Sequence, residues 1–161
     1  MMHNGKFHVR RGNLWGKLSE VKVIPTNGDV SAQQLAVMGA GLAKQAAQMY
    51  PPLKTRLGNK IACCSRDETY IFPIPDEYAS MLNTSILVCL PTKHSWRDNS
   101  SISLITRGLQ RLVEYTNLFG WTDVEVPELG MGLGNLKKEE VYPLFDTMLD
   151  GRFTIVQYEE V

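Results

Sequence analysis

The chain has 161 residues, with 17 lysine and arginine residues balanced by 17 aspartate and glutamate residues. This length predicts one domain, spanning residues 1–161, that can bury a sizeable core without disulfides or metals. The balanced charge excludes a global basic field that would draw the chain to nucleic acid or membranes, although a local basic groove is still compatible with it. No apolar run approaches the roughly 18 residues of a membrane span, and the N-terminal residues lack the apolar core of a signal peptide.

Three cysteines are an odd number, and Cys63 and Cys64 are adjacent, which disfavours a disulfide between them. Cys89 lies in a segment that we expect to be a buried strand. This usage is typical of a reducing compartment, so we expect a cytoplasmic protein whose cysteines act as small apolar residues. The histidines are scattered, and neither a Cys-x-x-Cys nor a His-Glu-x-x-His pattern is present, so we expect no metal ion and no cofactor.

Hydrophobic patterning predicts strands and helices that alternate along the chain. In chain order we expect a strand at Lys6–Arg10, a strand at Val21–Thr26, an alanine-rich helix at Ala40–Tyr50, a short helix and then strands near Lys60–Cys63 and Tyr70–Ile74, a strand at Thr84–Leu90, an amphipathic helix at Ser100–Tyr115 capped by Ser100 or Asn99, a strand at Asp123–Val126, a helix around Val141–Leu149 and a strand at Thr154–Tyr158. Strands that alternate with crossover helices predict a three-layer α/β/α domain with a central mixed sheet.

Two glycine-rich turns, Met38–Ala43 and Gly130–Asn135, each stand between a strand-like and a helical stretch. Glycine allows a backbone to approach a ligand closely, and a helix start offers unpaired N–H groups and a partial positive charge to an anion. Ligands of such sheets bind beyond the carboxyl ends of the strands. We therefore expect both turns at that edge, holding one phosphate-rich ligand from two sides.

Neither turn has the Gly-x-Gly-x-x-Gly/Ala pattern of dinucleotide-binding enzymes, because Lys44 and Asn135 occupy the third position. The phosphate-binding loop Gly-x-x-x-x-Gly-Lys-Ser/Thr is also missing from the sequence. Classical dehydrogenase and kinase functions are therefore disfavoured.

Six short motifs occur in an order that resembles a macro domain, an ADP-ribose-binding fold. They are Gly12-Asn13-Leu14, Pro25-Thr26-Asn27, Met38–Ala43, Pro91–Arg97, Val126–Gly134 and Gln157-Tyr158-Glu159. The most specific is Pro91-Thr92-Lys93-His94-Ser95-Trp96-Arg97, followed by an amphipathic helix. Within the superfamily the chain looks most like the branch holding the terminal ADP-ribose glycohydrolase and the DarG-type antitoxins, which remove ADP-ribose from thymine in DNA.

The resemblance implies a set of ligand-binding residues along these motifs. The set is Asn13, Leu14, Met38, Gly39, Ala40, Gly41, Leu42, Thr92, Gly130, Met131, Gly132, Leu133, Gly134, Asn135 and Tyr158. The two turns would wrap the diphosphate and distal ribose with backbone amides, and Tyr158 would lie near the adenine, although a core tyrosine is an alternative. Asn27 would reach the distal ribose near the reactive C1″ carbon, although asparagine at a strand end is often only a turn former.

By the same resemblance, Lys93 carries the chemistry in this branch, with Asn27 as the second catalytic residue. A lysine beside a diphosphate can act as an electrostatic clamp, a proton donor or an amine nucleophile, or it can be a solvated loop residue. Trp96 and Arg97 could pack the loop, stack on a base or contact the phosphates of a modified strand.

The chain departs from its relatives at two positions. Asn13 replaces an aspartate that accepts a hydrogen bond from adenine, and Gly134 replaces the aspartate that partners the lysine of the protein-directed glycohydrolase. We therefore expect a hydrolase that removes ADP-ribose from a modified DNA base or from protein, with the departure at Gly134 favouring DNA. The alternatives are a non-catalytic ADP-ribose reader and an ADP-ribose 1″-phosphate phosphatase. The expected partner is ADP-ribose or an ADP-ribosylated macromolecule, with no membrane contact, and the expected oligomeric state is a monomer.

Overall fold

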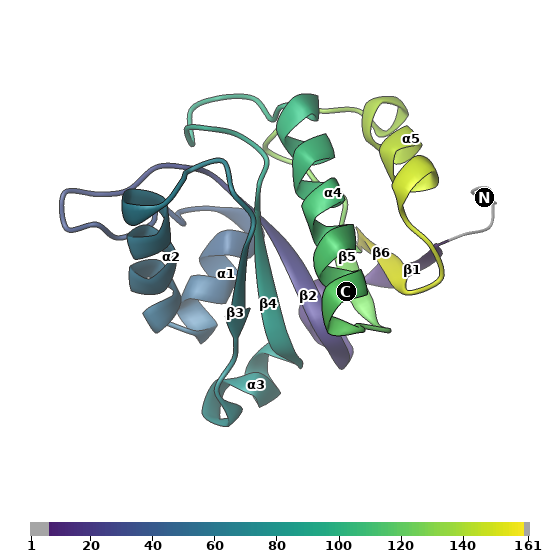
Figure 1. Cartoon of the computed structure of the whole chain (residues 1–161), viewed down its shortest axis with the longest axis horizontal. Coiled ribbons are helices and arrows are strands. Elements are labelled where there is room, and N and C mark those ends of the chain that lie inside the picture. The colour runs from purple at the N-terminus through teal and green to yellow at the C-terminus, as the bar shows by residue number, and fades with distance from the viewer. Residues whose placement is uncertain (1–6, 160–161) are drawn as a thin grey trace.

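A six-stranded mixed sheet forms the centre of the computed structural model, which describes residues 7–159 (Figure 1). Its strand order is β1-β6-β5-β2-β4-β3. The strands are β1 (His8–Gly12), β2 (Ser19–Thr26), β3 (Tyr70–Pro73), β4 (Thr84–Pro91), β5 (Val124–Pro127) and β6 (Phe153–Tyr158). All neighbours pair in parallel except β3, which runs antiparallel to β4.

Helices cover both faces of this sheet, because side chains of alternate strand residues point to opposite sides. The helices are α1 (Gly41–Met49), α2 (Pro52–Cys63), α3 (Asp76–Leu82), α4 (Ile102–Phe119) and α5 (Lys138–Met148), with a short 3₁₀ helix η1 (Leu14–Gly16). Val23, Val88 and Leu90 belong to one core with α4 and α5. Ile24 and Leu87 belong to a second core with α1, α2 and α3. The expected three-layer α/β/α architecture with a mixed sheet is confirmed.

The expected elements are confirmed except in the region between α1 and β4. Lys60–Cys63 is not a strand but the last turn of α2, which begins with a proline in its first turn and buries Leu53 and Leu57 at helical spacing. Helix α3 is not predicted by the sequence pattern; it begins after Pro75 and ends at Asn83, which has a left-handed conformation. Lys6 of the first expected strand lies outside the described residues.

Two element boundaries also differ from expectation. The cap of α4 is Ser101, whose hydroxyl accepts a hydrogen bond from the Leu104 N–H at 3.2 Å, and not Ser100 or Asn99. The apolar run before Met38 is not a strand; it lies in a long loop with one isolated bridge between Val30 and Ala36. The first glycine turn therefore follows a loop, whereas the second directly follows β5.

One of the three cysteines is buried and two are exposed. Cys89 is buried in β4, and this burial raises the pKa of its thiol. Cys63 and Cys64 are exposed and carry free thiols.

Among residues 7–159, no helix combines the length and apolarity needed to cross a bilayer.

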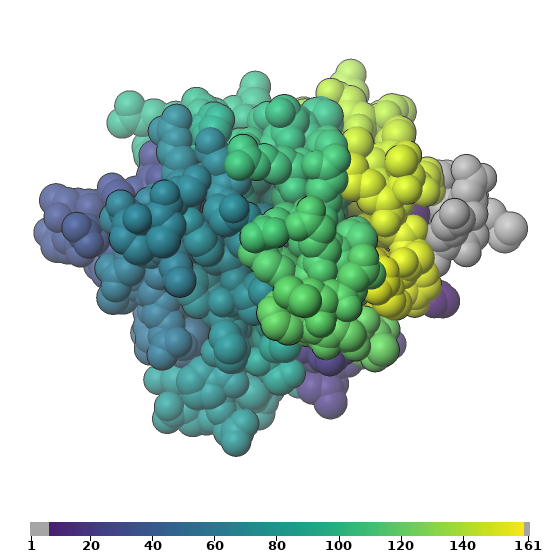
Figure 2. All heavy atoms as spheres, in the orientation of Figure 1, coloured from purple at the N-terminus to yellow at the C-terminus, as the bar shows by residue number. Residues whose placement is uncertain are grey.

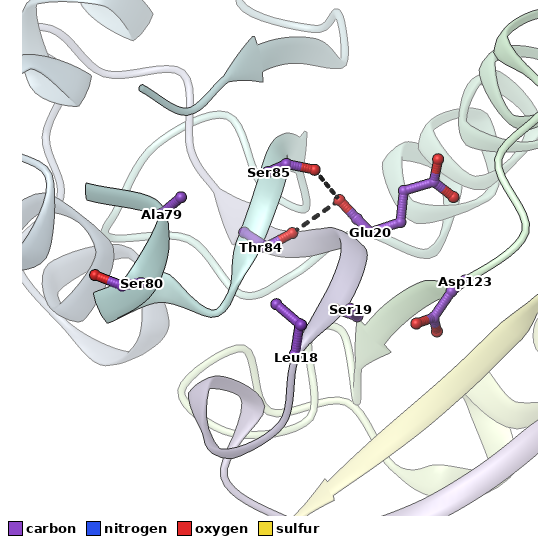
Figure 3. A pocket seen from close by; sticks show the side chains of 8 residues that line it. All are labelled: Leu18, Ser19, Glu20, Ala79, Ser80, Thr84, Ser85 and Asp123. Carbon is purple, nitrogen blue, oxygen red and sulfur yellow. Dashed lines mark hydrogen bonds between the residues drawn. The ribbon is translucent and has the colours of Figure 1, made fainter. Parts of the chain in front are cut away.

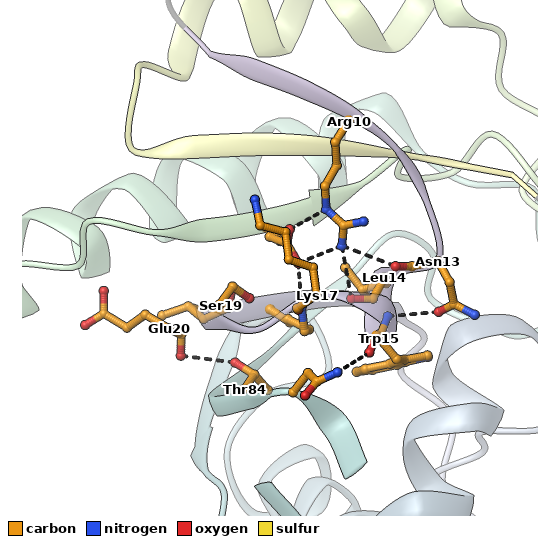
Figure 4. Close-up of polar contacts among 12 residues, drawn as sticks. Arg10, Asn13, Leu14, Trp15, Lys17, Ser19, Glu20 and Thr84 are labelled. Atoms are coloured by element: carbon orange, nitrogen blue, oxygen red, sulfur yellow. Dashed lines mark hydrogen bonds and ion pairs between the residues drawn. The ribbon is translucent and has the colours of Figure 1, made fainter. Parts of the chain in front are cut away.

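A largely buried charge cluster links residues of β1, β5 and β2. The carboxylate of Glu125 on β5 accepts hydrogen bonds from Lys22 Nζ on β2 at 2.5 Å and from Arg10 Nε on β1 at 2.5 Å. Arg10 also donates to the backbone carbonyls of Asn13 and Leu14, as Figure 4 shows. The Lys22 side chain is 0% exposed and donates in addition to the Lys17 carbonyl. The cluster therefore anchors the segment that follows β1 to the middle of the sheet.

We expect Glu125→Gln to lower the free energy of unfolding by about 3–5 kcal/mol, because it leaves the buried Lys22 ammonium beside Arg10 without a counter-charge. Urea unfolding at neutral pH measures this change. Glu114→Gln is the matched control, since Glu114 pairs with Arg111 at the exposed surface and should contribute at most about 1 kcal/mol. Equal losses in the two variants would contradict a stabilising role for the cluster.

The same carboxylate should make stability depend on pH. Burial alone would raise the pKa of Glu125, but the hydrogen bonds from Arg10 and Lys22 outweigh it and leave this pKa below its usual value. The unfolded chain therefore binds more protons between the two pKa values, so stability rises with pH there. The contribution is complete above about pH 4.3, the ordinary glutamate pKa, and is lost as the pH falls through the folded-state pKa. Urea unfolding across acidic pH should show a shallower slope for Glu125→Gln than for the wild type.

Candidate functional site

Five segments that are distant in sequence meet at one edge of the sheet, because parallel strands end on the same side. They are the segments that follow β1, β2, β4, β5 and β6. In Figure 1 this edge lies at the top, where β4 runs into the loop that leads to α4. Both glycine turns and Lys93 belong to these segments, so the expectation that they share one edge is confirmed.

The loops after β2 and β4 are joined by hydrogen bonds. The Asp29 carboxylate accepts from the Ser95 hydroxyl and from the Trp96 N–H, both at 2.9 Å. The Gly28 N–H donates to the His94 carbonyl at 2.8 Å. Sequence reasoning missed Asp29, since Asn27-Gly28-Asp29 signals a turn but does not indicate which distant loop its carboxylate contacts.

Asn27 shapes the loop that contains it. Its Nδ2 donates to the Val37 carbonyl at 3.1 Å, and its Oδ1 accepts from the Asp29 N–H at 2.9 Å. The structure thus gives Asn27 the role of a turn former. One N–H and one acceptor lone pair of the amide are not used by these bonds, so a contact to the distal ribose stays a prediction.

The first glycine turn is open to solvent. Gly39, Ala40 and Gly41 are exposed, while Met38 beside them is buried and Leu42 is half-buried. No atom lies within 4 Å of the position that a Cβ would take at Gly39 or Gly41, and Gly41 has a φ of +57°. Ala40 makes no side-chain bond to the first turn of α1. The N–H groups at the start of α1 are therefore free of a side-chain cap and are suited to bind an anion.

The second glycine turn is anchored to the start of α4. The Ser100 N–H donates to the Gly134 carbonyl at 3.0 Å, and Asn135 Nδ2 donates to Asn99 Oδ1 at 2.9 Å. Within the turn, a Cβ added at Gly132 would meet no atom within 4 Å, and the side chain of Leu133 is exposed. Met131 is half-buried.

The second turn does not lead directly into a helix start, contrary to expectation. Helix α5 begins at Lys138, and Glu139 and Glu140 occupy its first turn. These carboxylates already complement the positive end of the helix. Any anion held here would contact the backbone of the turn and not the N-terminus of α5.

Gly130 and Gly134 are required by packing. A Cβ at Gly134 would overlap the Ser100 side chain and the Gly130 carbonyl, and a Cβ at Gly130 would press on Ile105 and Leu136. Gly130 also has a φ of +75°, which favours glycine. The position corresponding to the aspartate of the protein-directed relatives therefore has no room for a carboxylate.

Lys93 is half-buried at the end of β4, and within residues 7–159 its amine has neither a hydrogen bond nor an ion pair. Its neighbour Thr92 is buried and well anchored. The Thr92 N–H donates to the Thr26 carbonyl at 3.0 Å, and its carbonyl accepts from the Ser101 N–H at 2.7 Å. The Lys93 amine therefore has no partner of opposite charge among the described residues, and the backbone that carries it is held by hydrogen bonds.

The segments after β1 and β6 lie side by side, since Gly12 pairs with Tyr158. Asn13 Oδ1 accepts a hydrogen bond from the Trp15 N–H at 2.9 Å, and Leu14 is buried. The Tyr158 side chain is 70% exposed. Tyr158 is therefore not a core tyrosine, and its ring is available to a ligand at this end of the edge.

A separate hollow of about 510 Å³ lies at the opposite edge of the sheet (Figure 3). It is lined by Leu18, Ser19, Glu20, Ala79, Ser80, Thr84, Ser85 and Asp123. Its charged lining residues are both acidic, so it is unsuited to a phosphate-rich ligand.

Among the described residues, no group of three or more His, Cys, Asp or Glu side chains is placed to hold a metal ion.

Comparison with known proteins shows which proteins this chain is similar to. No family model matches the chain. A curated relative, the DNA ADP-ribosyl glycohydrolase of Mycobacterium tuberculosis, is 32% identical over 108 residues, which cover 66% of this chain and 30% of the relative. The chain therefore spans less than a third of that relative's length.

Solved structures agree along nearly the whole chain. The macrodomain of Mycobacterium tuberculosis DarG has a TM-score of 0.75 at 24% identity, covering 98% of this chain and 99% of that one. Thermosipho africanus DarTG in complex with ADP-ribose has a TM-score of 0.78 at 23% identity, covering 93% of this chain and 41% of that one. The chain therefore has the macrodomain fold, and its structure is similar to the macrodomains of DarG proteins.

Proposed function

We propose that this chain binds ADP-ribose at the carboxyl edge of its sheet and hydrolyses it from a modified DNA base. The observation that carries the proposal is the unpartnered Lys93 amine beside two open glycine turns. The turns offer backbone N–H groups to a diphosphate, as preformed small-ligand sites do. The relatives add support, since one is named a DNA ADP-ribosyl glycohydrolase and another was solved with ADP-ribose.

Lys93 is the proposed acid of the reaction. As the bond between C1″ and the base nitrogen breaks, the Lys93 ammonium gives a proton to the departing nitrogen. Water adds to C1″ and returns a proton to the amine, so the balance is that of simple hydrolysis. The glycine turns hold the diphosphate and so fix C1″ relative to Lys93.

DNA is the proposed conjugate because Gly134 provides no carboxylate to act together with the lysine. Gly134 cannot carry a side chain in this packing, as the contacts with Ser100 require. A mechanism that uses a lysine together with an aspartate at this position is therefore not open to this chain.

A non-catalytic reader of ADP-ribose is the second candidate function. The observation that favours it is the same missing carboxylate, since binding by backbone amides needs no acid–base group.

We further propose that the protein acts as a monomer in the cytoplasm without a cofactor. The exposed, unpaired thiols of Cys63 and Cys64 support a reducing compartment.

One panel of substrates separates these functions. The protein is incubated with ADP-ribosylated DNA, ADP-ribosylated protein and ADP-ribose 1″-phosphate, and free ADP-ribose is measured. Release from DNA faster than from glutamate-linked protein supports the proposal. Release from none of them, together with tight ADP-ribose binding in calorimetry, assigns the reader function, and release only from ADP-ribose 1″-phosphate assigns a phosphatase. Absence of ADP-ribose binding would refute the whole assignment.

Lys93→Ala should reduce turnover of ADP-ribosylated DNA by roughly 100-fold or more, the usual size of a general acid–base contribution. Affinity for ADP-ribose should stay within several-fold, because backbone amides and not the lysine hold the diphosphate. Lys60→Ala on the exposed surface of α2 is the matched control and should change neither quantity. A loss of affinity as large as the loss of turnover would make Lys93 a clamp and not an acid.

The two glycines of the second turn should respond differently to substitution. Gly132→Glu should abolish ADP-ribose binding but leave the free energy of unfolding nearly unchanged, since its side chain enters open space where the ligand is expected. Gly134→Ala should cost about 1–3 kcal/mol of stability by overpacking against Ser100. Calorimetry and urea unfolding measure the two effects, and undiminished affinity in a folded Gly132→Glu variant would remove this turn from the site.

A further inference from the structure

A tryptophan projects from the surface next to the proposed catalytic lysine. The Trp96 side chain is 56% exposed, and the Arg97 guanidinium lies 5.2 Å from the centre of its ring. In Figure 2 the atoms of the loop between β4 and α4 project from the upper left of the molecule. A single exposed hydrophobic residue is common, so exposure alone assigns no function. The hydrogen bonds and charges around Trp96 are the further observations that point to a function.

The loop that carries Trp96 is held by its own hydrogen bonds. The Trp96 N–H donates to the Asp29 carboxylate, and the Ser95 N–H donates to Asp98 Oδ2 at 3.2 Å. The Asp98 N–H closes the turn by donating to the Ser95 carbonyl at 3.0 Å. Because the backbone is already ordered, a partner that stacks on Trp96 loses less free energy to loop ordering than it would on a mobile loop.

The charges around the loop are arranged for an anionic partner. Asp29 and Asp98 are engaged by the hydroxyl and backbone N–H groups just described, and Asp67 Oδ1 lies 2.8 Å from His94 Nδ1. Arg97 is exposed, and the half-buried Lys93 amine is unpaired among the described residues. Lys93 and Arg97 are therefore free to contact phosphates, whereas the Asp29 and Asp98 carboxylates already accept hydrogen bonds.

An aromatic ring beside unpaired cations is the combination that binds single-stranded nucleic acid, where bases stack and phosphates pair with arginine and lysine. Trp96 lies three positions after Lys93 along the chain, so their Cα atoms are at most about 11 Å apart. A strand advances about 3.4 Å per nucleotide in stacked form. A base within about three nucleotides of the modified one can therefore reach the Trp96 ring.

We propose that Trp96 and Arg97 dock the unpaired DNA strand next to the ADP-ribosylated base. Trp96 stacks on a neighbouring base, and Arg97 contacts its phosphate. This inference rests on the proposed function and adds to it the surface that selects an oligonucleotide over an isolated modified nucleoside.

The test compares Trp96→Ala and Arg97→Gln with wild type on three probes: free ADP-ribose, an ADP-ribosylated thymidine nucleoside and an ADP-ribosylated single-stranded oligonucleotide. Trp96→Ala should lower kcat/KM on the oligonucleotide by roughly 10-fold or more, as expected for one lost stacked base. Its kcat/KM on the nucleoside and its affinity for ADP-ribose should stay within about 2-fold. Arg97→Gln should reduce the salt dependence of oligonucleotide binding by about 0.7 in logarithmic slope for one lost phosphate contact.

Phe119→Ala is the matched control, because Phe119 is 57% exposed but lies at the far end of α4. Trp96→Ala behaving like this control on the oligonucleotide would overturn the inference, as would equal losses on all three probes. An ADP-ribosylated peptide serves as a fourth probe, and a loss on it as large as that on the oligonucleotide would show that the surface does not select DNA. Each of these outcomes requires that wild type releases ADP-ribose from the modified oligonucleotide, so they are distinguishable from failure of the proposed function, in which wild type releases none.

Discussion

The carboxylate of Asp29 joins the two loops on which the candidate site depends. The long loop after β2 brings the first glycine turn to the edge of the sheet, and the loop after β4 carries Lys93. Neither loop is regular, so hydrogen bonds between them must set their separation. By accepting from both the Ser95 hydroxyl and the Trp96 N–H, Asp29 gives this contact two charge-assisted bonds, which are stronger than neutral ones. The positions of the turn and the lysine are thereby made interdependent.

Charged groups are used in two different ways in this molecule. Near the segment after β1, Lys22 and Glu125 are buried and pair with each other and with the half-buried Arg10, which also donates to the Asn13 and Leu14 carbonyls. At the carboxyl edge, by contrast, Lys93 has no partner among the described residues. The paired charges stabilise the sheet. The unpaired Lys93 amine lies where an anionic ligand could serve as its counter-ion. This contrast is the main electrostatic argument for placing the site at this edge.

Sequence patterns predicted the layers and the site edge because both follow from local signals. The apolar strands and the glycine turns are read from short stretches, and parallel pairing then brings the turns together. The strand predicted at Lys60–Cys63 is wrong because the pattern of four residues is too short to distinguish a strand from the last turn of a helix. The contact between Asp29 and the Trp96 loop, and that between Gly134 and Ser100, join residues that only the tertiary fold makes neighbours. The isolation of the Lys93 amine is likewise a property of the folded surroundings and not of its motif.

The packing of Gly134 against Ser100 also constrains which substitutions at the candidate site could arise during evolution. A single substitution of Gly134 to aspartate would meet the Ser100 side chain before its carboxylate could assist Lys93. A smaller residue at Ser100 would relieve only part of that clash, because the Gly130 carbonyl also lies against the Cβ position, and it would give up the hydroxyl that bonds Thr92 next to Lys93. The two positions are therefore epistatic, since the effect of either change depends on the residue at the other. Placing an aspartate beside Lys93 would therefore require coordinated changes in two loops, and single substitutions at Gly134 are disfavoured.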